Sequence, residues 1–111
     1  MHESSAIPLP ECLPDAIRRL ARELNPHQII LFGSWARGDA RPDSDLDLLI
    51  VMPEVENKRE TAIQAMRALG DLPVSKDVVV TTPDEILARG DEIGLILRPA
   101  LREGVVVYEH E

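Results

Sequence analysis

Residues 28–51 read QIILFGSWARGDARPDSDLDLLIV, and this stretch decides the fold. Its first five residues, Gln28–Phe32, form a short aliphatic run that predicts a strand. Gly-Ser ends that run abruptly, and Ser34 can cap a short helix that starts directly after it. Residues 39–44 are rich in Asp, Arg and Pro, which predicts a loop. Residues 45–52 then predict a second strand, so the stretch is a pair of strands joined by a helical turn and a loop.

The residues on either side supply elements that can pack against this pair. Apolar side chains at helical spacing and residues typical of helix caps indicate helices, and β-branched runs indicate strands. Gly70 is expected to end one of the helices in the left-handed conformation. The order of the elements predicts an α/β or α+β domain in which helices pack against a small sheet. Helices are predicted at residues 13–24, 58–69, 83–89 and 91–102, and further strands at residues 75–81 and 105–108.

The size and composition of the chain allow one folded domain. It has 111 residues, of which 44% are hydrophobic, and we divide it into a poorly ordered lead-in at residues 1–11 and one domain at residues 12–111. The formal net charge is −8, so the basic face of a general nucleic-acid binder is not expected. The single cysteine, Cys12, cannot form an internal disulfide. Neither a signal peptide nor a membrane span is predicted, which makes a cytoplasmic protein the simplest interpretation.

Three aspartates stand in apolar strands. Asp45 and Asp47 point to the same face of the second strand because side chains alternate along a strand. Two carboxylates about 4 Å apart repel by about 4 kcal/mol at an effective dielectric of about 20. Either one of them is protonated or a cation lies between them, and Mg²⁺ is the cation that such carboxylate pairs typically hold. Asp77, in SKDVVVT, reaches the same site if the third strand lies beside the second. Three carboxylates could then hold two ions, with Asp77 also placed to accept a proton. The alternative is that all three are solvated residues near strand ends.

The turn between the first two strands has the residues of a phosphate site. Backbone N–H groups at a glycine turn that opens a helix bind anions, so Gly33 and Ser34 are candidates for phosphate binding. Arg37 adds a bidentate phosphate donor. Ser44 is expected to position the loop by bonding backbone groups, next to the same site. The predicted nucleotide-binding residues are therefore Gly33, Ser34, Arg37 and Ser44.

The second strand is apolar on both faces beyond its aspartates. Leu49 and Val51 share the face of Asp45 and Asp47. This predicts a cover over part of that face, made by another helix or a partner chain, or by this chain's own first helix or last segment.

The full motif, GSWARGDARPDSDLDLLIV, resembles the signature of the DNA polymerase beta-like nucleotidyltransferase superfamily. Its GS-x-ARG turn followed by SD-x-DL is similar in particular to the minimal nucleotidyltransferase (MNT) family, and the resemblance runs from about Pro14 to Tyr108. The resemblance implies a single minimal domain with a small mixed β-sheet and helices mainly on one face. It also implies that Gly33 and Ser34 bind the triphosphate.

The same resemblance implies roles for the charged residues of the motif. Asp45 and Asp47 would be Mg²⁺ ligands, Asp77 would be the third acidic residue of the metal and catalytic site, and Arg37 matches the arginine of the family.

Members of the MNT family are best known as antitoxins paired with a helical HEPN-domain RNase toxin. The resemblance implies that this chain moves AMP from ATP to a tyrosine hydroxyl of such a toxin and so silences it. The acidic net charge suits a basic, RNA-binding partner. Two alternatives stay open: transfer to a small hydroxylated molecule, as in aminoglycoside-modifying relatives, or a purely steric block of the toxin.

Overall fold

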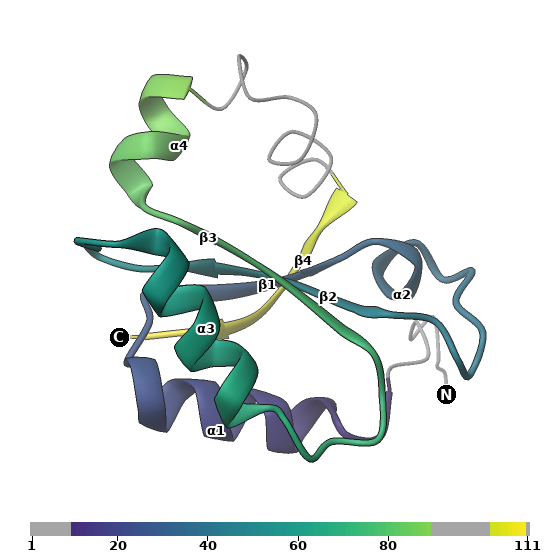
Figure 1. Ribbon diagram of the computed structural model, residues 1–111. Helices are drawn as coiled ribbons and strands as arrows, with labels where there is room; N and C mark the ends of the chain where they lie inside the picture. The colour runs from purple at the N-terminus through teal and green to yellow at the C-terminus, as the bar shows by residue number, and fades with distance from the viewer. Residues whose placement is uncertain (1–9, 90–102, 111) are drawn as a thin grey trace.

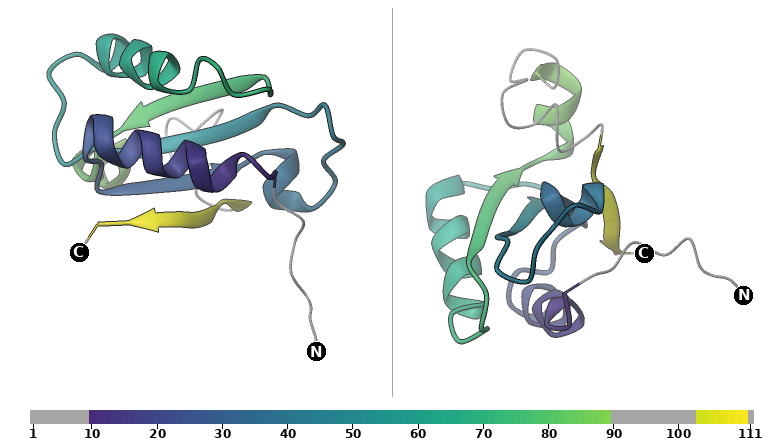
Figure 2. Two further views of the ribbon diagram at one scale, coloured as in Figure 1. Left: turned by 90° about the horizontal axis from the view of Figure 1, so that it is seen from below. Right: turned by 90° about the vertical axis from the view of Figure 1, so that its right-hand side faces the viewer.

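A computed structural model describes residues 10–89 and 103–110 of the chain. Its centre is a four-stranded sheet (Figure 1), and the strands follow one another in the order β3-β2-β1-β4 (Figure 2, left). Most of the predicted lead-in and the helix predicted at residues 91–102 lie outside the described residues. The elements are α1 (Leu13–Leu24), β1 (Gln28–Phe32), α2 (Ser34–Arg37), β2 (Leu46–Val51), α3 (Lys58–Ala68), β3 (Lys76–Thr81), α4 (Pro83–Arg89) and β4 (Val105–Glu109).

The sheet is mixed, as the resemblance implied. β1 runs antiparallel to both β2 and β4, whereas β2 and β3 are parallel and are joined through α3. The register places Phe32 opposite Asp47 on one side and Asp77 beside Asp47 on the other. The end of β1 and the starts of β2 and β3 therefore meet at one edge of the sheet.

One face of the sheet carries the main core. α1 and α3 pack side by side over this face (Figure 2, left), and their apolar side chains meet those of the strands. α1 begins with Pro14 in its first turn and ends at Asn25, which has a left-handed φ of 52°. Asn57 caps α3 by accepting a hydrogen bond from the Glu60 N–H at 3.1 Å, as the capping pattern predicts. The buried residues of the main core include Leu13, Ala16, Leu20, Ile29, Leu31, Leu46, Leu48, Ile50, Ala65 and Leu69.

A smaller cluster lies on the other face, which is also the face of the aspartates. Leu49 and Val51 are buried there together with Ile30, and Ile86 of α4 packs against them. The cover predicted over this face is thus supplied within the chain, and burial of Leu49 and Val51 gives no indication of a partner. α4 is held in place by a hydrogen bond of 2.7 Å from the buried Thr81 hydroxyl to Glu85.

Candidate active site

The three predicted aspartates gather at the edge where β2 and β3 begin. Asp47 and Asp77 are direct neighbours on parallel strands, whose backbones lie about 4.8 Å apart. Asp45 precedes β2 by one residue, and it lies near enough for its negative charge to act on Asp47. Asp45 and Asp77 are exposed and Asp47 is half-buried. The prediction that β3 lies beside β2, and so brings Asp77 to the pair, is confirmed.

The electrostatics of the site converge on Asp47. Partial burial raises the pKa of its carboxyl above 3.8, and the negative charges of Asp77 and Asp45 raise it further. The positive charge of Arg37 lowers the same pKa by a smaller amount. The charges of Asp45, Asp77 and Arg37 therefore all act on Asp47. A bound cation would reduce the repulsion between the three carboxylates.

Gly33 brings the backbone of the turn directly against Asp47. Its φ of 77° and ψ of −156° lie in a region that only glycine occupies readily. A Cβ built on Gly33 would overlap Oδ2 of Asp47 and would lie 3.0 Å from its Cγ. Both the backbone conformation and the close approach require glycine at this position, so the backbone of the turn lies directly against the Asp47 carboxylate.

The glycine turn opens directly into α2. The carbonyl oxygen of Gly33 accepts hydrogen bonds from the N–H groups of Ala36 and Arg37 at 3.1 and 3.0 Å. The first N–H groups of a helix have no acceptor within it, so those of Ser34 and Trp35 remain for another acceptor. Gly33 is the N-cap and Ser34 is the first helical residue, so the prediction that the Ser34 side chain caps this helix is wrong.

The loop between α2 and β2 is fastened at Ser44. The Ser44 hydroxyl oxygen accepts a hydrogen bond from the Arg41 N–H at 2.7 Å, and the Ser44 N–H donates to the Arg41 carbonyl at 2.9 Å. The indole N–H of Trp35 donates to the Ser44 carbonyl at 3.3 Å. Ser44 thus shapes the loop that ends at Asp45, as the sequence predicts, and its contact with nucleotide stays a prediction.

Arg37 lies among carboxylates on its exposed side. Its Nε is 3.4 Å from Oδ2 of Asp39, and its Nη1 is 3.6 Å from Oε1 of Glu103, just before β4. The side chain of Arg37 is 47% exposed, so it can reach a ligand in solvent. Sequence reasoning missed Glu103 because it follows Arg37 by more than half the chain and belongs to no local motif.

The aspartates have the ligand chemistry of a Mg²⁺ site, since this ion takes carboxylate oxygens and keeps positions for substrate phosphates. Within residues 10–89 and 103–110, no three acidic, histidine or cysteine side chains lie close enough together to hold an ion. Asp45 and Asp77 are exposed, so their side chains have room to turn toward Asp47. The three aspartates have the right chemistry for Mg²⁺. For all three to bind one site, the side chains of Asp45 and Asp77 must rotate toward Asp47.

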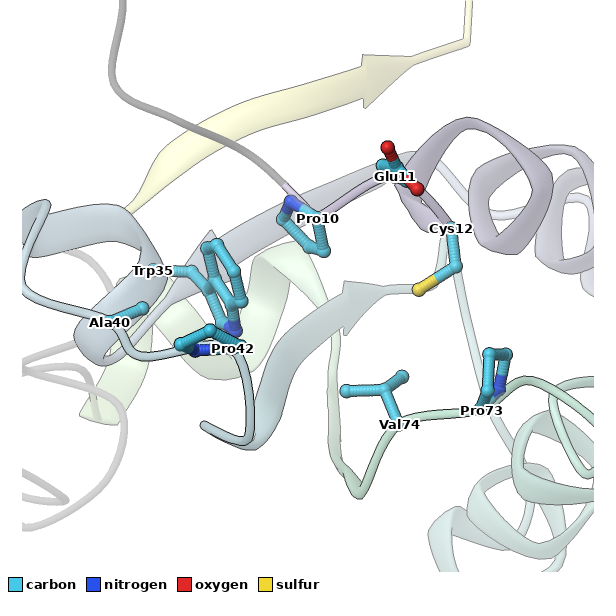
Figure 3. A pocket seen from close by; sticks show the side chains of 8 residues that line it. All are labelled: Pro10, Glu11, Cys12, Trp35, Ala40, Pro42, Pro73 and Val74. Carbon is cyan, nitrogen blue, oxygen red and sulfur yellow. The ribbon is translucent and has the colours of Figure 1, made fainter.

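A pocket of about 480 Å³ lies next to the site (Figure 3). Trp35 and Pro42 form one side of it, and Cys12 at the start of α1 and Val74 before β3 form the other. None of the three aspartates lines this pocket. Trp35 therefore packs as a wall residue of this pocket.

No helix in the described part of the chain is both long and apolar enough to cross a membrane.

Comparison with known proteins points to one kind of chemistry. Residues 14–103 match the model of a family described as the nucleotidyltransferase domain. No curated protein sequence matches the chain.

Solved structures share the fold at low identity. A toxin–antitoxin structure with AMP-PNP is 19% identical with a TM-score of 0.57, and the match covers 89% of this chain and 75% of that one. A mutant of the toxin–antitoxin MntA–HpeT is 16% identical with a TM-score of 0.58, covering 88% and 73%. Spectinomycin adenyltransferase AAD(9) from Enterococcus faecialis, solved with ATP and spectinomycin, is 18% identical with a TM-score of 0.63, covering 88% and 56%. These matches confirm the predicted fold class and agree with the resemblance to minimal nucleotidyltransferases.

Proposed function

Because this chain belongs to the nucleotidyltransferase domain family, we propose that it is a Mg²⁺-dependent enzyme that transfers AMP from ATP to a protein hydroxyl. The acceptor is a tyrosine of a cognate HEPN-domain RNase toxin, and the chain acts as its antitoxin. The observation that carries the proposal is that Asp45, Asp47 and Asp77 gather where β2 and β3 begin, with the glycine turn at Gly33 directly against Asp47.

The residues at this edge of the sheet can bind the metal ion and the triphosphate. Asp45, Asp47 and Asp77 would hold Mg²⁺, which supplies charge stabilisation to the phosphates when bound. The N–H groups at Ser34 and the guanidinium of Arg37 would bind the triphosphate. These contacts would orient the α-phosphate toward the acceptor.

The proposed transfer breaks one phosphate bond and forms another. The acceptor hydroxyl oxygen bonds to the α-phosphorus, and the bond from that phosphorus to the bridging oxygen of the β-phosphate breaks. Pyrophosphate leaves with the electron pair of the broken bond. Asp77 would accept the proton of the hydroxyl, because it is exposed at the mouth of the site beside Asp47.

A protein partner is supported by two observations. The formal net charge of −8 favours association with a basic partner. Structures of similar fold include toxin–antitoxin pairs, one of them with AMP-PNP.

The test uses labelled ATP, Mg²⁺ and the product of the adjacent gene as acceptor. We expect label on that protein with the wild-type chain and none with the Asp45→Asn plus Asp47→Asn variant. Asp43→Asn, an exposed aspartate of the same loop, is the matched control and should keep the activity. A tyrosine-to-phenylalanine change at the labelled position of the acceptor should remove the label.

Other outcomes would contradict this proposal in distinct ways. Neutralisation of the toxin that survives the double aspartate change would favour a steric block. Label found only on a small hydroxylated molecule would place the chain with transferases such as the spectinomycin enzyme, of which it spans 56%.

A further inference from the structure

Arg37 is a basic residue that lies among several acidic groups at the proposed triphosphate site. It approaches Asp39 through Nε and Glu103 through Nη1, at 3.4 and 3.6 Å, and it acts electrostatically on Asp47. Glu103 lies two residues before the edge strand β4, which is on the far side of β1 from β2. The guanidinium therefore joins the glycine turn to the last strand of the sheet.

The ion pair between Arg37 and Glu103 is easily exchanged. Both side chains are about half exposed, at 47% and 48%, and exposed pairs of this kind contribute about 0.2–1 kcal/mol. A phosphate is a stronger acceptor for a guanidinium because it can accept two parallel N–H bonds. A triphosphate that binds at Ser34 would thus compete with Glu103 for the same donors.

We propose that Glu103 is a further residue of the nucleotide site, which holds Arg37 in the absence of nucleotide and must release it when the triphosphate binds. This inference rests on the nucleotide site of the proposed function. The carboxylate of Glu103 lowers nucleotide affinity, and it does so through Arg37 and not as a general negative charge. Asp39, the second partner of Arg37, acts in the same direction.

The experiment measures the dissociation constant of Mg²⁺-ATP by titration calorimetry at about 0.1 M salt, where screening length is about 10 Å. Glu103→Gln should bind about 1.4- to fivefold more tightly than the wild type, the range that an exposed ion pair covers. Glu109→Gln is the matched control, because Glu109 is an exposed carboxylate at the far end of β4, where it accepts a hydrogen bond from the Gln28 side chain at 3.0 Å. Its affinity should equal that of the wild type. Thermal unfolding of each variant confirms that it is folded.

A double-mutant cycle separates the proposed route from simple charge repulsion. In an Arg37→Gln background, the change Glu103→Gln should leave the dissociation constant unaltered. Equal tightening in both backgrounds would overturn the inference, as would unchanged or weaker binding by Glu103→Gln alone. Asp39→Asn should also bind Mg²⁺-ATP more tightly than the wild type. If neither Glu103→Gln nor Asp39→Asn binds more tightly, the inference is wrong. If the wild-type chain bound no Mg²⁺-ATP at all, the proposed function would be wrong as well.

Discussion

Replacing Gly33 with alanine should damage both the fold and the site. The φ of 77° and ψ of −156° at Gly33 strain any residue with a side chain, at a cost of about 1–3 kcal/mol. The new Cβ would also overlap Oδ2 of Asp47, and moving that side chain off its rotamer costs about 0.5–1.5 kcal/mol. The free energy of unfolding should therefore fall by about 1.5–4.5 kcal/mol in Gly33→Ala.

Urea unfolding at pH 7 measures this loss, with Gly70→Ala as the matched control. Gly70 has no positive φ, and a Cβ there would lie 3.4 Å from the Arg67 carbonyl oxygen. The control should thus stay within about 0.5 kcal/mol of the wild type. Transfer of AMP by Gly33→Ala should fall as well, because Asp47 is displaced from its place beside Asp77.

A second background isolates the contact with the carboxylate. In Asp47→Ala, the nearest remaining atom of residue 47 is Cβ, 3.3 Å from the position of the added methyl group. The Gly33→Ala change should then cost only the backbone strain of about 1–3 kcal/mol. An equal cost in both backgrounds would refute the close approach, and a Gly33→Ala protein as stable as the wild type would refute the strain.

Three further changes probe the surroundings of the site. Because burial and neighbouring charges raise the pKa of Asp47 above 3.8, ionised Asp47 destabilises the folded state, so Asp47→Asn should be more stable than the wild type at pH 7. This gain in the free energy of unfolding should vanish as pH falls through the raised pKa to below 3.8. Urea unfolding across pH measures the difference between variant and wild type, and a difference that does not change with pH would contradict the prediction. Trp35→Phe removes the indole donor to the Ser44 carbonyl and should cost about 0.5–1.5 kcal/mol by urea unfolding; an unchanged midpoint would exclude a structural role for this bond. Thr81→Val removes the hydroxyl that donates to Glu85 and should cost about 1.5–3 kcal/mol, the range for a hydrogen bond to a charged group, whereas Thr81→Ser should recover most of this loss in the same assay.

The elements predicted from the sequence match the structure where local patterns decide them. Apolar spacing and a first-turn proline predicted Leu13–Leu24, and α1 has these bounds. The ends of strands depend on pairing with neighbouring strands and differ slightly from the prediction. For example, β2 begins at Leu46, which leaves Asp45 outside the strand. Gly70 is a wrong prediction, since α3 ends at Ala68 with Leu69 as its C-cap, and Gly70 has no left-handed φ.

The site divides in the same way between local and distant contributions. The glycine turn and the pair Asp45 and Asp47 are visible in one short motif, whereas the position of Asp77 depends on the register between two strands. Glu103 could not be predicted, since a pair with Arg37 requires the last strand to dock beside β1. The burial of Leu49 likewise depends on how α4 returns over the sheet.

The order of strands in the sheet also bears on how the protein folds. β1 pairs with β2 through Gln28 and Val51, and with β4 through Gln28 and Glu109, a separation of 81 residues. Closing the longer loop costs about 1 kcal/mol more in chain entropy, so we expect β4 to dock last. During synthesis, the three aspartates can assemble as soon as β3 has emerged, before Glu103, the proposed competitor for Arg37, and β4 have been made.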